Sequence, residues 1–144
     1  MAKIGVIGSG AWGTALGVHA ARAGHDVTMW AYEPEVVAEM MEQHENKTFL
    51  AGFKLPRGLD ATEDIAAACE GATVVIFACP SKHLRVISTQ AAPFVGPDTV
   101  LCVVSKGVEN GSLKLMTEVL AETLPEVDAK RVSVLSGPSF AKEV

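Results

Sequence analysis

The chain has 144 residues, of which 49% are hydrophobic and 20% charged, and its formal net charge is −5. This length and composition fit one domain with a buried core, and the mild negative charge, without a basic tail or lysine-rich run, argues against a nucleic-acid partner. Three widely spaced cysteines predict neither a disulfide framework nor a metal site. The apolar runs are too short to cross a bilayer, and the first predicted strand leaves no room for a signal peptide, so we expect a cytoplasmic domain without membrane insertion.

The first predicted elements are a strand, a glycine turn and a helix. Residues 3–7 are apolar and β-branched, as in a buried parallel strand, and residues 14–23 form a helix of small residues that ends at Gly24. The turn between them reads Gly-Ser-Gly-Ala-Trp-Gly, which in this context is the dinucleotide fingerprint. Gly8 permits the tight turn, Gly10 lets backbone N–H groups approach a pyrophosphate, and Gly13 lets the helix pack closely. The alternative is a structural turn that binds nothing.

The rest of the chain continues to alternate strands and helices. Strands are expected at residues 26–32, 59–61, 73–79, 99–104 and 132–135, and helices at about 35–44, 65–69, within 83–92 and at about 113–124. Repeated βα units with doubly apolar strands predict a doubly wound, mainly parallel α/β sheet, the Rossmann dinucleotide-binding fold. A ligand then lies at the carboxyl ends of the strands, where we expect residues 8–13, 32–33, 79–81, 105–107 and 136–139 to converge.

Two residues after the second strand are candidates for the cofactor site. Glu33 lies 20 residues beyond Gly13, the spacing of an acid that accepts a hydrogen bond from a ribose 2′-hydroxyl. Capping the helix that begins near Pro34 is an equally good interpretation of Glu33. Tyr32 either contacts the adenine or covers the edge of the sheet. No Arg or Lys follows this strand closely, so the residues alone favour NAD over NADP.

Two further strand ends offer groups for an anionic ligand. Lys106 directly follows a buried strand, where its ammonium can bind a phosphate or carbonyl oxygen, and the alternative is a solvated loop lysine. Ser139 and the N–H groups near Gly137 precede a second predicted helix start at Phe140, which is another anion-binding geometry. No histidine stands in a position that favours catalysis.

Four blocks of sequence together resemble the bacterial type of NAD(P)-dependent glycerol-3-phosphate dehydrogenase. They are GSGAWGTAL at 8–16, VTMW at 27–30, SKG at 105–107 and SGPSFAKE at 136–143, and residues 46–50 also match, with Ala51 where proline is usual. The resemblance covers essentially the whole chain. It implies reversible hydride transfer between a nicotinamide and C2 of the glycerol phosphate skeleton, interconverting dihydroxyacetone phosphate and sn-glycerol 3-phosphate for phospholipid synthesis.

The resemblance also implies which residues meet each ligand. By position, those near the cofactor are Ala11, Trp12, Tyr32, Lys106 and Ala141, and those near the small phosphorylated substrate are Lys106, Gly137 and Ser139. Because the family accepts both nicotinamide dinucleotides, the expected cofactor is NAD or NADP.

The resemblance further implies a helical second domain that carries the catalytic general acid/base lysine. We therefore interpret residues 1–144 as an NAD(P)-binding domain without a catalytic residue of its own, part of a longer enzyme that is a candidate homodimer. Two alternatives remain open at this point. One is another two-domain dehydrogenase of the 6-phosphogluconate-like type, and the other is a stand-alone dinucleotide-binding module such as a redox sensor.

Overall fold

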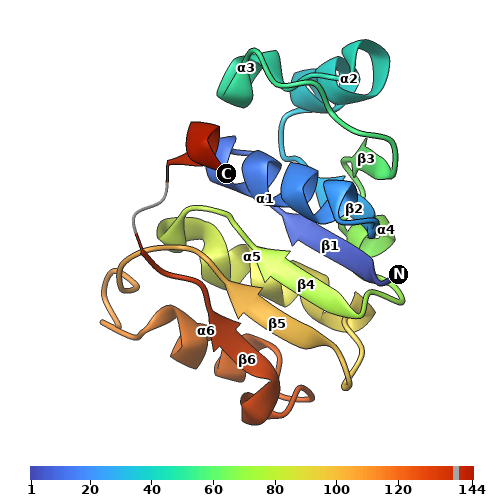
Figure 1. Cartoon of the computed structure of the whole chain (residues 1–144). Coiled ribbons are helices and arrows are strands. Elements are labelled where there is room, and N and C mark those ends of the chain that lie inside the picture. The colour runs from blue at the N-terminus through green and yellow to red at the C-terminus, as the bar shows by residue number, and fades with distance from the viewer. Residues whose placement is uncertain (138–139) are drawn as a thin grey trace.

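Six parallel strands form a single twisted sheet in the computed structural model, which describes residues 1–137 and 140–144 (Figure 1). The strands are β1 Lys3–Ile7, β2 Asp26–Trp30, β3 Leu59–Thr62, β4 Val74–Phe77, β5 Val100–Val103 and β6 Val132–Val134. Their order across the sheet is β3-β2-β1-β4-β5-β6, and every neighbouring pair is parallel. The chain therefore runs outward from β1 to one edge, returns, and runs outward from β4 to the other edge. This confirms the predicted doubly wound α/β fold, with its switch point between β1 and β4.

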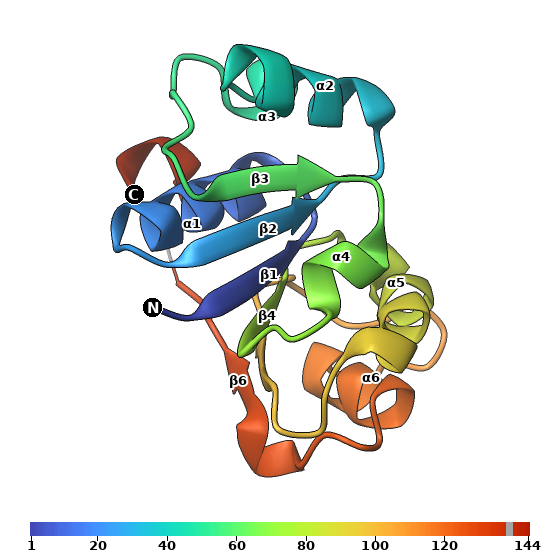
Figure 2. The same cartoon turned by 90° about the vertical axis from the view of Figure 1, so that its right-hand side faces the viewer.

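Helices cover the sheet on both faces (Figures 1 and 2). They are α1 Ala11–Arg22, α2 Pro34–Gln43, α3 Lys47–Leu50, α4 Ile65–Cys69, α5 Leu84–Ala91 and α6 Met116–Thr123, with short 3-10 turns η1 Ser81–His83, η2 Ala92–Phe94, η3 Ala129–Arg131 and η4 Ala141–Glu143. Helices α4, α5 and α6 lie on one face, and α1 lies on the other with η4 beside it. None of the helices among the described residues is long and apolar enough to cross a membrane.

Alternate side chains of the central strands point to opposite faces of the sheet and belong to two separate hydrophobic cores. Phe77 and Leu101 are fully buried against the helices α4–α6, whereas Val6 and Met29 are fully buried on the face of α1 and α2. Because these strands are buried on both faces, their sequences read as continuous apolar runs. The expectation was wrong at one position, because Cys102 was predicted to be buried and is only half-buried. Helices α1 and α2 pack over the β1–β3 half of the sheet, and no residue of β5 or β6 belongs to the core beneath them.

Several predicted boundaries were wrong by a few residues. The last long helix begins at Met116 rather than near Leu113, because Leu113 has a left-handed φ of 58° and belongs to a turn in which the Glu109 N–H donates to the Lys114 carbonyl. Helix α3 was not predicted, and it lies in a segment without a periodic pattern. Its N-cap is Asn46, whose side chain accepts a hydrogen bond from the Phe49 N–H.

Candidate functional site

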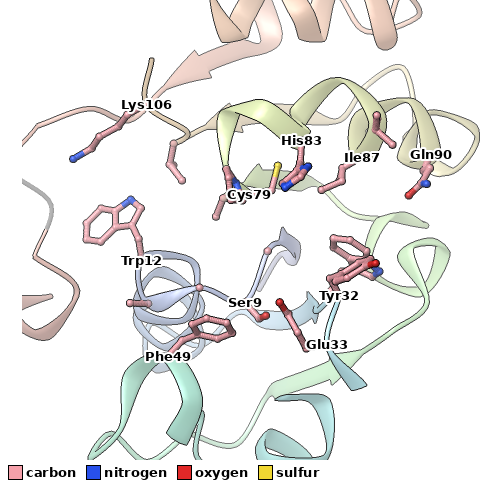
Figure 3. Close-up of a pocket in the computed structure, with 18 residues that line it drawn as sticks. Ser9, Trp12, Tyr32, Glu33, Phe49, Cys79, His83, Ile87, Gln90 and Lys106 are labelled. Carbon is pink, nitrogen blue, oxygen red and sulfur yellow. The ribbon is translucent and has the colours of Figure 1, made fainter. Parts of the chain in front are cut away.

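A cavity of about 830 Å³ opens at the carboxyl ends of the central strands (Figure 3). The glycine turn forms one wall, the chain that follows β4 and helix α5 form the opposite wall, and Phe49 of α3 closes part of the rim. Seven of the predicted cofactor residues line this cavity together, namely Gly8, Gly10, Ala11, Trp12, Tyr32, Glu33 and Lys106. The switch point of the sheet thus brings these distant segments to one hollow.

The three glycines of the turn are constrained in three different ways. Gly8 has a left-handed φ of 120°, and a Cβ there would lie 2.8 Å from the Ala78 carbonyl. A Cβ on Gly13 would lie 2.2 Å from the Gly8 carbonyl oxygen, so only glycine lets α1 pack this close to the turn. A Cβ on Gly10 would meet no atom within 4 Å, and Gly10 lines the cavity. The backbone at Gly10 is therefore open to a ligand rather than packed against protein.

The N-terminus of α1 faces this cavity and provides an anion-binding geometry. Gly10 is the N-cap residue, without a side chain to cap the helix, and its carbonyl accepts the first helical bond from the Thr14 N–H at 2.9 Å. The N–H groups of Ala11, Trp12 and Gly13 have no acceptor within the helix. The first turn contains no acidic residue, so the positive end of the helix dipole is not neutralised by a side chain there.

The end of β2 contributes Tyr32 and Glu33 to the cavity. Glu33 occupies the N-cap position of α2, but its side chain forms no capping hydrogen bond, so the capping interpretation of this carboxylate is not supported. Tyr32 is 78% exposed, and its ring lies edge-on to Trp30 with the ring centroids 6.4 Å apart. Trp30 itself is fixed by a hydrogen bond from Nε1 to the Glu63 carbonyl.

Lys106 enters the cavity from the loop after β5, near Trp12 (Figure 3). It is exposed, but the chain on either side of it is anchored. The Ser105 hydroxyl donates to the Cys79 carbonyl, and Arg85 of α5 donates two hydrogen bonds, at 2.7 and 2.8 Å, to the Glu109 carboxylate. These bonds, followed by one from Ser112, lower the pKa of Glu109 to about 2. Glu109 therefore remains a charged partner for Arg85 throughout the neutral pH range.

Comparison with known proteins gives the family. Residues 3–144 match the family described as the NAD-dependent glycerol-3-phosphate dehydrogenase N-terminus. The chain belongs to this family. It is 45% identical over 142 residues to a glycerol-3-phosphate dehydrogenase of Geobacter sp. strain M21, and the match covers 99% of this chain and 42% of the relative. It is 52% identical over 146 residues to the glycerol-3-phosphate dehydrogenase of Caulobacter vibrioides, with the same two coverages. Both relatives are named NAD(P)+ enzymes. The crystal structure of the glycerol-3-phosphate dehydrogenase from Coxiella burnetii superimposes with a TM-score of 0.90 at 35% identity, covering 99% of this chain and 42% of that one.

These family relatives are longer than this chain, which spans about two fifths of their length. The matched family is the N-terminal part of the NAD-dependent dehydrogenase, as the four sequence blocks indicated. The comparisons do not favour the stand-alone module or another two-domain dehydrogenase.

Two residues assigned through the family resemblance, Gly137 and Ala141, do not line this cavity. Gly137 is exposed beyond β6 with a φ of 151°, and Ala141 is half-buried in η4, which packs beside α1. Ser139 lies outside the described residues. A smaller cavity of about 360 Å³, lined by residues that include Ser105, Lys106 and Ser136, adjoins at the ends of β5 and β6. Val104 and Lys106 line both cavities, so the chain that follows β5 lies between them.

Other residues of the large cavity were not predicted individually. Phe49, His83, Ile87 and Gln90 all line it. The match of residues 46–50 to the family was a signal for Phe49. Helix α5 offered no such signal, because its cavity residues belong to an ordinary amphipathic pattern whose direction only the fold determines.

A buried polar cluster connects α3 to the glycine turn. Asn46 is fully buried, and its Nδ2 donates to the Ser9 carbonyl and to the Thr14 hydroxyl, each at 2.8 Å. The Thr14 hydroxyl in turn donates to the same Ser9 carbonyl at 3.1 Å. Because Asn46 also caps α3, one side chain holds both the Ser9 backbone and the helix that presents Phe49.

We expect Asn46→Ala to lower the free energy of unfolding by about 3 kcal/mol, since it removes two buried hydrogen bonds to the glycine turn and the N-cap hydrogen bond of α3. Urea unfolding of both proteins measures this change. Gln43→Ala, at the exposed end of α2, is the matched control and should stay within about 0.5 kcal/mol of the wild type. An Asn46→Ala protein as stable as the control would show that the cluster contributes little.

Proposed function

We propose that this chain binds NAD(H) or NADP(H) in the large cavity and acts as the cofactor-binding domain of a dehydrogenase that interconverts dihydroxyacetone phosphate and sn-glycerol 3-phosphate. The observation that carries the proposal is the open backbone at Gly10, directly at the uncapped N-terminus of α1. That arrangement suits a pyrophosphate, because N–H donors and the helix dipole meet it without a side chain in between. The family membership of the chain supports the same cofactor.

We assign different parts of the cavity to the two halves of such a cofactor. The pyrophosphate would lie on Gly10, Ala11 and Trp12, the adenosine over the end of β2, and the nicotinamide toward Lys106. When bound, the nicotinamide donates a hydride to C2 of the substrate or accepts one from it. Lys106 would hold a substrate or cofactor oxygen by its charge, with Gly137 and Ser139 as further substrate contacts and the small adjoining cavity as the substrate side.

The setting we propose is the cytoplasm, with the complete enzyme as a candidate homodimer and the glycerol phosphate serving phospholipid synthesis. The odd number and wide spacing of the three cysteines fit a reducing compartment. Burial raises the pKa of Cys69 to about 12 and that of Cys79 to about 11, so both stay protonated and unreactive.

We expect the purified 144-residue chain to bind NADH yet to show no oxidation of NADH with dihydroxyacetone phosphate. Reduction of a ketone needs a proton donor within hydrogen-bond reach of the carbonyl oxygen. Among the described residues that line the cavity, Lys106 is assigned to positioning, whereas His83, beside Ile87 on the α5 side, and Tyr32, at the end of β2, lie away from Lys106 (Figure 3).

An absorbance assay of NADH oxidation tests this expectation, with the complete Caulobacter vibrioides relative as the positive control. Turnover by the chain at a rate near that of the control would show that the general acid lies within these residues and that its role was misassigned.

A further inference from the structure

We propose that Asn46 is a positioning residue for the dinucleotide, which fixes the peptide bond between Ser9 and Gly10 so that the Gly10 N–H is directed at the pyrophosphate. The inference rests on the proposed function, because it states how the glycine turn is held ready for that ligand. Asn46 itself does not line the cavity, and it lies 37 residues beyond Ser9 in the chain. It therefore acts through the turn and not on the ligand.

The buried polar cluster occupies both acceptor positions of the Ser9 carbonyl oxygen. The Asn46 Nδ2 donates to this oxygen at 2.8 Å and the Thr14 hydroxyl donates to it at 3.1 Å. Asn46 and Thr14 are both fully buried, so the carbonyl is directed into the protein. The C=O and N–H groups of a trans peptide point in opposite directions. The Gly10 N–H consequently points away from the cluster, and Gly10 lines the cavity.

The Gly10 N–H is left for a ligand in this orientation. It donates to no group in the described part of the chain. The next two N–H groups, those of Ala11 and Trp12, begin α1 and have no acceptor within the helix. A pyrophosphate at this point meets three successive N–H donors, and the first of them is present only while the Ser9 carbonyl stays turned inward.

The glycine turn does not fix this peptide by itself. Gly10 has a φ of −61°, but glycine adopts positive φ about as readily, and a Cβ there would meet no atom within 4 Å. Packing at Gly10 therefore does not prevent the Ser9–Gly10 peptide from rotating. A rotated peptide would present its carbonyl oxygen to the pyrophosphate in place of the N–H, and two negative groups would then face each other. The residue that favours a close ligand thus needs a constraint from elsewhere.

The Asn46 side chain provides this constraint because all of its hydrogen-bonding groups are used. Its Nδ2 donates to the Ser9 carbonyl and to the Thr14 hydroxyl, each at 2.8 Å, and its Oδ1 accepts from the Phe49 N–H at 3.0 Å. Rotation of the peptide would take the shared acceptor away from both Asn46 and Thr14. Unpaired donors are costly in a buried position, so the cluster holds the carbonyl inward.

Asn46→Asp separates the turn from the cap of α3. The new side chain keeps an oxygen that accepts from the Phe49 N–H, but an ionised carboxylate has no hydrogen to donate, and a protonated one has a single hydrogen where asparagine has two. We expect this variant to bind NADH about thirtyfold more weakly than the wild type, and to bind 5′-ADP, which also carries a diphosphate, more weakly by a similar factor. Thr14→Val removes the other donor to the Ser9 carbonyl and should weaken NADH binding about threefold.

Val119→Ala is the matched control for a general loss of stability. Val119 is fully buried in α6, within the core on the opposite face of the sheet, and it lines neither cavity. Removing its methyl groups destabilises the fold without touching the turn. Its affinity for NADH should stay within about twofold of the wild type. Calorimetric titration, at a temperature where circular dichroism shows each variant folded, gives these affinities.

The amide proton signal of Gly10 in NMR spectra reports the orientation of the peptide directly. In the wild type we expect this signal to move downfield when NADH or 5′-ADP is added, because the N–H then donates to a phosphate oxygen. In Asn46→Asp saturated with the same ligands, the shift should be much smaller. In Val119→Ala it should match the wild type.

The outcomes separate the two proposals. Wild-type affinity in Asn46→Asp, or an unchanged shift of the Gly10 signal there, would overturn the positioning role and leave the proposed function standing. A loss of affinity in Val119→Ala as large as in Asn46→Asp would assign the effect to stability and overturn the positioning role as well. Binding of neither NADH nor NADPH to the folded wild-type chain would overturn the proposed function and the positioning role with it.

Discussion

Gly10→Val is expected to abolish NADH and NADPH binding while the fold stays intact. A Cβ at Gly10 meets no protein atom within 4 Å, so the folded chain accommodates the new side chain. The valine methyl groups would instead block the approach of a pyrophosphate to the backbone N–H groups at the N-terminus of α1. Calorimetric titration measures the binding, and urea unfolding measures the stability.

Substitutions at two other glycines serve as controls for this experiment. Gly96 lies in the turn before β5, outside the cavity, and a Cβ there would lie 3.5 Å from the Thr99 hydroxyl, an ordinary contact; Gly96→Val should therefore retain binding. Gly13→Val should show the opposite defect, a loss of stability, because its Cβ would lie 2.2 Å from the Gly8 carbonyl oxygen. Wild-type affinity in Gly10→Val would contradict the assignment of the glycine turn as the pyrophosphate site.

Lys106→Met, made in the complete dehydrogenase that we propose, is expected to reduce kcat/KM for dihydroxyacetone phosphate about a hundredfold. One well-placed cationic donor contributes about 3 kcal/mol to a transition state with developing negative charge. Methionine keeps the length of the side chain and removes the ammonium. Since Lys106 is exposed and forms none of the ion pairs of the described residues, the stability of the enzyme should change little.

Lys82→Met is the matched control, because Lys82 is an exposed lysine of η1 that does not line either cavity. Steady-state kinetics of both variants gives the comparison. If kcat/KM of Lys106→Met stays close to that of Lys82→Met, Lys106 is a solvated loop lysine and the substrate must be held by other groups.

The sheet and one half of the site were predictable because their signals are local. A glycine turn between an apolar strand and a helix determines its own geometry, and strands buried on both faces are recognisable as continuous apolar runs. Once the strands were assigned, the rule for parallel sheets placed Tyr32, Glu33 and Lys106 at the same edge, where the structure also has them.

The missed features depend on contacts between distant residues. Asn46 bonds to Thr14 and Ser9, 32 and 37 residues away, so the short helix that it caps could not be recognised from its neighbours in the sequence. The residues of α5 reach the cavity only because that helix packs beside the switch point. The half-exposure of Cys102 likewise reflects how far α1 and α2 extend over the sheet, which its own strand does not encode.

Tryptophan fluorescence of the purified chain during titration with NADH is the most direct test of the account. The chain has two tryptophans, Trp12 and Trp30, and both line the cavity. NADH bound there therefore quenches the fluorescence of both tryptophans by accepting their excitation energy. We predict saturable quenching in the wild type that is reversed by excess NAD and absent in Gly10→Val. No saturable quenching of the folded wild-type chain, or the same quenching in Gly10→Val, would contradict the claim that this cavity is the dinucleotide site.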